Sequence, residues 1–348
     1  MTTAFASDRE AFYERMAACG LTPLWAIMSE AVPRQPKPTC KAALWSFSRD
    51  IRPALLEAGE LISAAEAQRR VLILNNPALT RGVTPTLFCG VQMIKGGEIA
   101  PAHRHTQSAL RFVIEGEGAY TAVDGERTLM HPGDFIVTPA WCWHDHAKPD
   151  GGPMFWLDGL DIPLVNYFGA TFAEDYGAAQ YPVAQLVEDP QLRFAPGLRS
   201  LAPVVTRGRS PIINYRYDCT RESLHAMSSG ECDPVNGFKL RYAHPITGDF
   251  ALPTIASFIQ LLPAEFAGAA YRSTEATVYM VVEGSGRVSI GEQSFSLRRN
   301  DIFVVPNWTW VALEANEELV LFSFSDRPVL QKLGLFREET DRNTGTSP

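Results

Sequence analysis

An internal duplication constrains the fold of this chain more than any other feature. The segment "FVIEGEG" (112–118) has a counterpart in "MVVEGSG" (280–286), and "GDFIVTPAWCW" (133–143) has one in "NDIFVVPNWTW" (300–310). The paired segments lie 168 and 167 residues apart, so a second copy of one unit follows the first along the 348-residue chain. Each copy consists of short β-branched runs between Gly and Pro, which is typical of a β-barrel or sandwich. We therefore predict two similar β-barrels.

The organisation of the rest of the chain follows from this repeat. Helical patterns precede the first copy, and Pro-rich loops separate the copies. The predicted parts are an N-terminal helical arm (1–80), a first barrel (81–165), a connecting segment (166–250), a second barrel (251–326) and a C-terminal tail (327–348).

Composition argues against several classes of partner. The 31 basic and 39 acidic residues give a net charge of −8 without a basic cluster, which disfavours nucleic-acid binding. No stretch of about 18 apolar residues could span a membrane, and the N-terminus lacks the apolar core of a signal peptide. The six cysteines show no CxxC spacing and are typical of reduced thiols. We expect a cytoplasmic protein without a nucleic-acid or membrane partner.

The first copy carries a metal-binding pattern. Successive side chains of a strand alternate between its faces, so His103, His105, Gln107, Ala109 and Arg111 would share one face if this segment is a strand. Imidazole is the commonest metal ligand in proteins. Two imidazoles on one face would leave such a site one or two ligands short.

A neighbouring strand can supply the missing ligand. The segment "PAWCWHDH" (139–146) offers His144 and His146, again two residues apart. The turn "VDGE" (123–126) lies between the two histidine pairs and would allow them to meet through a hairpin. The alternative, core histidines satisfied by hydrogen bonds, explains a lone histidine better than this spacing.

The spacing of these residues resembles that of the cupins, small antiparallel barrels that hold a metal inside. Gly97, followed after five intervening residues by His103 and His105, resembles the first cupin motif, and Gly133, followed after five intervening residues by Pro139 and then by His144, resembles the second. The resemblance implies that His144 is the third ligand and that His146 is not.

One position departs from the general cupin pattern. Ala109 occupies the place where many cupins carry a metal-binding Glu, four residues after the second histidine. The site would then consist of three neutral imidazoles. Iron(II) would keep its full double charge there and retain open positions, which suits an anionic chelating substrate together with O₂.

The segments "HRHTQSALRF" (103–112) and "WHDH" (143–146) are similar to the gentisate 1,2-dioxygenase family, which includes salicylate and 1-hydroxy-2-naphthoate dioxygenases. The resemblance covers most of the chain, through "LTPLW", "RRVLILNNPAL", "RYAHPITG", "LPTIASF" and "SFSDRPVLQKLGL". It implies a mainly β bicupin, a homodimer or homotetramer, that uses non-haem iron(II). Such an enzyme inserts both atoms of O₂ between the carboxyl-bearing and hydroxyl-bearing ring carbons, so that gentisate would give maleylpyruvate.

Two further polar residues are candidates for substrate binding and catalysis. A buried Arg111 needs a partner, and a substrate carboxylate would bind its guanidinium in bidentate fashion. The alternative is an internal salt bridge to Asp134 or Glu115. We assign His146 to the substrate hydroxyl or carboxylate, as a donor or proton relay. The alternative for His146 is a rim histidine bonded to a strand edge.

Other positions lie near the predicted pocket. Gln107 could bond to a ligand histidine, to O₂ or to the substrate. Of the adjacent Arg69 and Arg70, which precede the barrel, the resemblance suggests that one clamps the substrate carboxylate, and we choose Arg70, with a surface position as the alternative. Phe88 could stack on the substrate ring beside Gly90, although core packing is the commoner role of such a Phe.

The second copy has lost this chemistry. Aligning the repeats places Tyr271, Ser273 and Val311 at the three ligand positions, and Leu313 and Tyr279 at the positions of the fourth histidine and the arginine. We predict no metal in this half, which would serve as scaffold and subunit interface.

The substrate is less constrained than the reaction. Gentisate is our first choice, and salicylate, a 5-substituted salicylate such as 5-nitrosalicylate, or 1-hydroxy-2-naphthoate are alternatives. A non-catalytic bicupin that binds an aromatic acid is a rival from another class. A manganese- or nickel-dependent cupin is a further rival, which Ala109 disfavours because the usual version needs four ligands.

Overall fold

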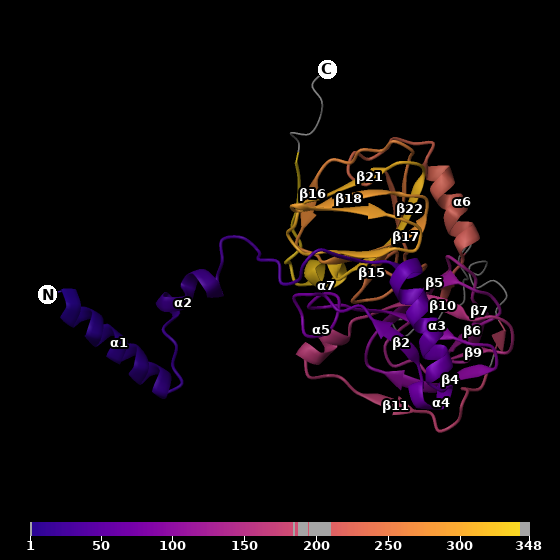
Figure 1. The fold of residues 1–348 in the computed structure, drawn as a ribbon, viewed down its shortest axis with the longest axis horizontal. Helices are drawn as coiled ribbons and strands as arrows, with labels where there is room; N and C mark the ends of the chain where they lie inside the picture. Colours follow the sequence, from indigo (N-terminus) through magenta and orange to yellow (C-terminus); the bar gives the residue numbers. More distant parts are fainter. Residues whose placement is uncertain (1, 184, 187–193, 195–209, 342–348) are drawn as a thin grey trace, which may run out of the picture. The chain divides into compact units, whose positions relative to one another are not determined.

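The computed structural model describes residues 2–183, 185–186, 194 and 210–341. The chain divides into two compact units, Met1–Lys37 and Pro38–Pro348. The first unit contains helices α1 (Thr2–Ala18) and α2 (Leu24–Ala31) (Figure 1). No residue of α2 is buried. Among the described residues, no helix is both long and apolar enough to cross a membrane.

The first barrel is built, within the described part of the second unit, from two six-stranded sheets. One has the order β13-β8-β5-β10-β3-β2, with strands Asn214–Tyr215, Phe135–Thr138, Ala109–Glu115, Met154–Leu160, Phe88–Ile94 and Arg70–Ile73. The other has the order β11-β4-β9-β6-β7-β12, with strands Ala173–Asp175, Glu98–His105, His144–Lys148, Tyr120–Val123, Glu126–Leu129 and Gln185–Leu186.

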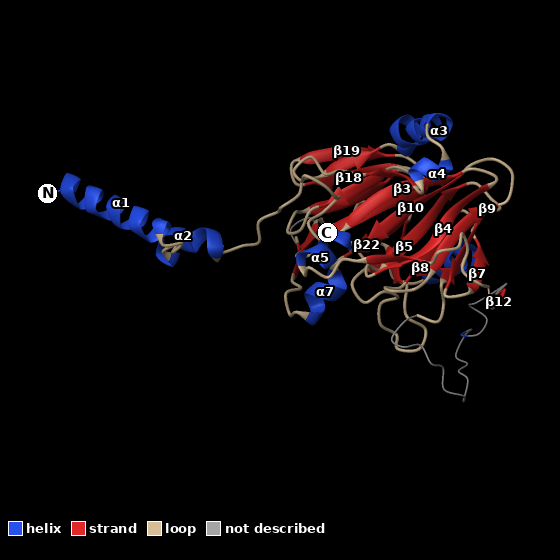
Figure 2. Cartoon of the chain, turned by 90° about the horizontal axis from the view of Figure 1, so that it is seen from below, coloured by secondary structure: helices blue, strands red, loops and turns tan. Residues whose placement is uncertain are grey.

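The second barrel repeats this arrangement. Its larger sheet has the order β1-β20-β17-β22-β15-β14, with strands Ala43–Trp45, Ile302–Val305, Thr277–Glu283, Leu319–Ser325, Ala256–Leu262 and Phe238–Arg241. Its smaller sheet has the order β19-β18-β21-β16-β23, with strands Gln293–Leu297, Gly286–Ile290, Val311–Ala315, Tyr271–Ser273 and Glu338–Thr340. The predicted mainly β, two-barrel fold is confirmed, and Figure 2 shows how strands dominate this unit.

Short helices accompany the barrels. They are a π-helix (Phe47–Ile51), α3 (Arg52–Leu61), α4 (Ala64–Ala67), α5 (Ile162–Tyr167), α6 (Tyr217–Met227) and α7 (Arg327–Lys332). Helices α5 and α7 each follow the last long strand of a barrel, and each begins after an Asp with Pro in its first turn, where a missing N–H costs nothing. The duplication therefore extends beyond the strands.

The repeat begins earlier in each half than the sequence indicated. Strand β2 lies inside the predicted arm (1–80) and pairs with β3, and strand β14 lies inside the predicted connecting segment (166–250) and pairs with β15. The first strands are exchanged: β1 pairs with β20 of the second barrel, and β13 pairs with β8 of the first. Strands of two and three residues carry too little pattern to be assigned from sequence.

The "VDGE" turn also serves a different pair of strands than we predicted. It joins β6 to β7, with Asp124 and Gly125 at φ 46° and 87°, the left-handed conformation of a tight two-residue hairpin. The histidine strands β4 and β9 pair without being joined by this hairpin.

The largest apolar cluster lies between the two barrels. The rings of Phe112 and Phe322, from the larger sheets of the first and second barrels, stack with centroids 4.2 Å apart. A Cβ at Gly159 would lie 2.9 Å from the ring of Phe324, so this contact requires glycine. The strands of these sheets are consequently buried on both faces, one toward the neighbouring barrel and one toward their own interior.

Candidate metal centre

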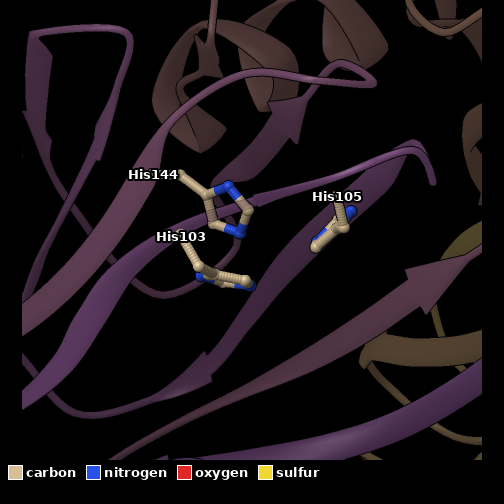
Figure 3. A group of neighbouring side chains, drawn as sticks. All are labelled: His103, His105 and His144. Atoms are coloured by element: carbon tan, nitrogen blue, oxygen red, sulfur yellow. The ribbon is translucent and has the colours of Figure 1, made fainter. Parts of the chain in front are cut away.

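Three histidines meet inside the first barrel. His103 on β4 lies directly opposite His144 on β9, and His105 follows two residues later on the same face. The ring centroids of His103 and His144 are 4.2 Å apart, and one nitrogen from each of the three rings lies within 4.8 Å of the others. Figure 3 shows the three rings turned toward a common space. The structure thus brings together the residues that we predicted as ligands.

The fourth histidine lies beside this group. The register of β4 against β9 shifts between Ala100 and His103, so His146 stands opposite Ala100. His146 is fully buried and packs its ring 5.6 Å from that of Trp156. Neither of its ring nitrogens has a hydrogen-bond partner among the described residues. A buried polar ring in this state has bonding capacity left for a ligand.

The protonation of the rings suits a divalent metal ion. Nδ1 of His105 lies 2.9 Å from the carbonyl of Gln107, and Nδ1 of His144 lies 3.0 Å from the carbonyl of Cys142. A carbonyl only accepts, so both rings carry their proton on Nδ1 and leave the Nε2 lone pair free.

Burial also keeps the imidazoles neutral. It lowers the pKa of His105 to about 4 and, together with the nearby guanidinium of Arg69, lowers the pKa of His103 to about 3. Burial likewise holds the pKa values of His144 and His146 well below their usual range. All four rings are therefore uncharged at neutral pH, so a metal ion can bind a ring nitrogen without displacing a proton from it.

A buried arginine faces the histidines from the opposite sheet. The guanidinium of Arg111 donates to the hydroxyl of Thr138 at 2.6 Å, and its Nε lies 3.6 Å from a carboxylate oxygen of Asp158, its direct neighbour on β10. Our alternative partners for Arg111 were wrong. Glu115 is bound by Arg52, and Asp134 accepts from the backbone N–H of His131.

Arg69, not Arg70, reaches the histidines. Nη2 of Arg69 donates to the carbonyl of Pro101 at 2.7 Å and lies 2.5 Å from Nδ1 of His103. Arg70 instead pairs with Glu98 through two hydrogen bonds of 2.8 Å. Our choice of Arg70 was wrong because neighbouring residues of a strand point to opposite faces. Arg70 stands opposite Met93, which belongs to the apolar cluster outside the barrel.

Gln107 supports the site through its backbone. Its carbonyl orients His105, whereas its side-chain amide donates to the hydroxyl of Thr171 at 3.2 Å. The described structure therefore ties this side chain to the segment between α5 and β11. The direct contact with O₂ or substrate that we considered stays a prediction.

Phe88 and Gly90 lie on β3 beside the arginine. Gly90 is the cross-strand neighbour of Asp158, which in turn neighbours Arg111, so the three lie in one row across the sheet. A Cβ at Gly90 would lie 2.7 Å from the side chain of Val71 and 3.4 Å from the ring of Phe88. Glycine is thus required by packing, and a role of either residue in substrate binding stays a prediction.

Sequence reasoning missed Asp158 and Trp156. Burial raises the pKa of Asp158 to about 6, although the Arg111 charge and a hydrogen bond from the Trp156 indole oppose the rise. The signal was present: a lone acid within the apolar run "MFWLDGL" (154–160) is a perturbed carboxylate by default. Arg69 and Arg111 together outweigh Asp158, so the pocket carries excess positive charge before any metal binds.

Comparison with known proteins agrees with this site. Residues 90–160 match the cupin domain family. The chain is 47% identical over 341 residues to gentisate 1,2-dioxygenase 1 of Aquipseudomonas alcaligenes, covering 96% of this chain and 97% of that protein. It is 35% identical to a 1-hydroxy-2-naphthoate 1,2-dioxygenase of Nocardioides sp. (strain KP7), covering 99% and 90% of the two chains.

A solved structure supports the same relationship. The crystal structure of salicylate 1,2-dioxygenase from Pseudoaminobacter salicylatoxidans, determined with gentisate, superposes with a TM-score of 0.90 at 32% identity. The match covers 96% of this chain and 94% of that one. The full length of both barrels is therefore shared. This chain belongs to the gentisate 1,2-dioxygenase family of ring-cleaving dioxygenases.

Proposed function

We propose that the protein is an iron(II)-dependent dioxygenase that cleaves gentisate between the carboxyl-bearing and hydroxyl-bearing ring carbons. The observation that carries the proposal is the donor set. Three neutral imidazoles converge without a carboxylate at the position of Ala109, and two guanidinium groups lie beside them. Such a site leaves a divalent ion with its full charge and favours an anionic, chelating ligand.

His103, His105 and His144 would hold the metal. Their free Nε2 atoms, where carbonyl partners fix the proton on Nδ1, supply the lone pairs. Bound iron(II) would supply the one-electron chemistry by which an aromatic ring reacts with O₂. If His103 binds the metal through Nε2, its proton lies on Nδ1. That N–H would then face the N–H of Arg69, and two donors cannot bond to each other. Arg69 would then need another acceptor.

The arginines suit the carboxylate of the substrate. Arg111 is held in place by Thr138 and Asp158, yet its Nε has no hydrogen-bond partner in the described structure. Arg69, released from His103, offers a second guanidinium on the same pocket. A carboxylate would satisfy these donors and neutralise the excess positive charge.

His146 suits the hydroxyl group of the substrate. Its ring is buried, neutral at pH 7 and without a hydrogen-bond partner in the described structure. A neutral imidazole donates from one nitrogen and accepts at the other. It can therefore accept a hydrogen bond from an ortho-hydroxyl or donate one to its oxygen, and so orient this group.

The choice of gentisate rests on the relatives. The similar proteins act, by their names, on gentisate, 5-aminosalicylate, 1-hydroxy-2-naphthoate and 5-nitrosalicylate. The relatives at 47% and 36% identity, from Aquipseudomonas alcaligenes and Streptomyces sp., are both named gentisate dioxygenases. Salicylate, the 5-substituted salicylates and 1-hydroxy-2-naphthoate remain alternative substrates.

The test is O₂ consumption by protein loaded with iron(II) under anaerobic conditions. Gentisate, salicylate, its 5-amino and 5-nitro derivatives and 1-hydroxy-2-naphthoate are compared, with loss of aromatic absorbance as the second readout. We expect uptake with gentisate at one O₂ per ring. Tight binding of these acids without O₂ uptake would instead support the non-catalytic bicupin. Light scattering on the same sample tests the expected homodimer or homotetramer.

A further inference from the structure

An arginine on the outer face of the first barrel lies between the first two metal-binding histidines. Arg104 points away from the metal pocket and inserts its guanidinium between two indoles. Its Cζ lies 4.3 Å from the ring centroid of Trp141 and 4.4 Å from that of Trp143. Its Nε and Nη2 donate to one carboxylate oxygen of Glu174 at 2.9 and 2.5 Å. We call these four residues the outer clamp.

The outer clamp connects the three strands that frame the metal site. Arg104 belongs to β4, Glu174 is its direct cross-strand partner on β11, and Trp143 immediately precedes His144 on β9. The N–H of Trp141 donates to the carbonyl of His105 at 2.8 Å. Trp141 adopts φ 64°, a left-handed conformation that aromatic residues avoid unless other contacts hold it.

The second barrel contains the same clamp. The guanidinium of Arg272 lies 4.5 Å from the ring centroid of Trp308 and 4.6 Å from that of Trp310, and donates to Glu339 at 2.8 and 2.5 Å. The N–H of Trp308 donates to the carbonyl of Ser273 at 2.6 Å, and Trp308 has φ 53°. In the contacts of the arginine and in this backbone hydrogen bond, the two copies agree.

The inner layers of the two copies do not agree. The inward positions next to Arg272 are Tyr271 and Ser273, where Arg104 is flanked by histidines. The clamp therefore does not depend on the metal. Its contacts hold the strand that carries the arginine, β4 or β16, against the neighbouring strands, whichever side chains that strand turns toward the barrel interior.

The ligand strand needs such support because its own ladder is interrupted. The register of β4 against β9 shifts between Ala100 and His103, and β11, on its other side, is three residues long. The His-x-His segment keeps its backbone pairing on the β11 side, but its pairing with β9, the strand that carries His144, is interrupted. Two stacked indoles and a cross-strand carboxylate fix the planar guanidinium, and with it the backbone on both sides.

We infer that Arg104 is a positioning residue for the metal, one that sets the spacing of His103 and His105 relative to His144 from the opposite face of the strand. This inference rests on the proposed metal-dependent function. Arg272 offers a matched control, because it makes the same contacts in a barrel whose inner positions carry no imidazole.

The experiment compares Arg104→Met with Arg272→Met in the full-length protein. The measured quantities are the Kd for cobalt(II), from anaerobic competition with a chelator, the visible spectrum of the cobalt-loaded protein, and the Tm of the metal-free protein. Both variants should lower Tm to a similar extent. Only Arg104→Met should weaken cobalt binding, by about 10-fold or more, and alter the ligand-field bands.

A second pair of variants guards against misfolding. Glu174→Gln and its counterpart Glu339→Gln remove the ion pair but keep the arginine stacked between the indoles. Glu174→Gln should raise the cobalt Kd by a smaller factor than Arg104→Met, and Glu339→Gln should leave it unchanged. Arg104→Lys should recover only part of the affinity, since an ammonium cannot fill the planar slot.

The outcomes separate the two claims. Wild-type affinity and an unchanged cobalt spectrum in Arg104→Met or, if that variant does not fold, in Glu174→Gln, would overturn the positioning role while leaving the dioxygenase intact. Equal losses of affinity in the variants of both barrels would also overturn it, in favour of general stabilisation. Metal binding by the wild type without O₂ uptake on any of the acids would sink the proposed function alone. Failure of the wild type to bind metal would sink both.

Discussion

The two barrels of this protein share their strand register but differ in what fills them. In the first, His103 stands opposite His144, and in the second Tyr271 stands opposite Val311 at the same place in the sheet. The second interior contains an apolar cluster that includes Val281, Phe303, Leu313 and Leu321. The same fold therefore accommodates a polar or an apolar interior, and the function that we propose depends on the inward side chains of one copy.

The second barrel holds an ion pair beside the positions that correspond to the histidines. Glu275, at the position of Gln107, accepts from Arg327 at 3.0 and 2.6 Å and from Ser325 at 2.6 Å. Burial opposes ionisation of Glu275, but the hydrogen bonds from Arg327 and Ser325 lower its pKa. Arg327 also donates to the hydroxyl of Tyr271 at 3.3 Å. These polar groups of the second barrel bond to one another, whereas Arg111 Nε and both ring nitrogens of His146 in the first barrel have no hydrogen-bond partner among the described residues.

Removal of a proposed ligand should distinguish the two barrels most clearly. His105→Ala should lose the metal, with an affinity reduced by more than about 100-fold, because removing a direct ligand costs more than removing a supporting residue. Metal content by mass spectrometry after chelator challenge measures this. Its counterpart Ser273→Ala in the second barrel should retain the full content. A metal-free Ser273→Ala protein would show that the second barrel does contribute.

Arg111 distinguishes substrate binding from metal binding. Arg111→Met should lower kcat/KM by about 100-fold while iron stays bound, because a buried charge contact to the substrate is lost. Steady-state kinetics on iron-loaded protein test this. The variant also leaves Asp158 without its partner, so Arg111→Met combined with Asp158→Asn controls for stability. Loss of iron in the single variant would assign Arg111 to the metal site itself.

Breaking the ion pair of the second barrel should affect stability alone. Glu275→Gln removes the counter-charge of the half-buried Arg327 and should lower the free energy of unfolding by about 2 kcal/mol. Denaturant unfolding measures the loss, and metal affinity should be unchanged. If the metal Kd rose together with the loss of stability, the two barrels would be coupled more closely than their separate interiors suggest.

Acid should destabilise the metal-free protein through the first barrel. The pKa of His105 is about 4 in the native state, against 6.5 when unperturbed. Between these values the unfolded chain binds a proton that the native state excludes, so stability rises with pH across this window and falls as pH is lowered.

The variant His105→Gln should flatten this dependence slightly, as seen in unfolding free energies measured at several pH values. Other buried groups titrate in the same range, so the difference between wild type and variant is the quantity to compare. An identical slope in both would mean that the pKa of His105 is the same in the native and the unfolded state.

Much of the site could be predicted from sequence because it depends on short-range periodicity. The period of two along a strand puts His103 and His105 on one face, and the repeat offset aligns each with its counterpart in the second copy. Both features can be recognised in the sequence without knowledge of the tertiary fold. The place of Ala109, where many cupins carry a carboxylate ligand, came instead from the resemblance to the cupins.

The tertiary structure decided which residues meet across strands. Alternation says that Arg69 and Arg70 point to opposite faces, but only the packing of β2 shows which face is the pocket. The partner of Arg111 is Asp158, 47 residues away, because β5 and β10 are neighbours in the sheet. The sequence alone was enough to predict the repeat and the barrels, and, with the resemblance to the cupins, the three histidines that we propose as ligands. Which charged side chains surround these histidines depends on strand register and strand order. Pairing between strands that are far apart in the sequence leaves no local sequence pattern from which it could be predicted.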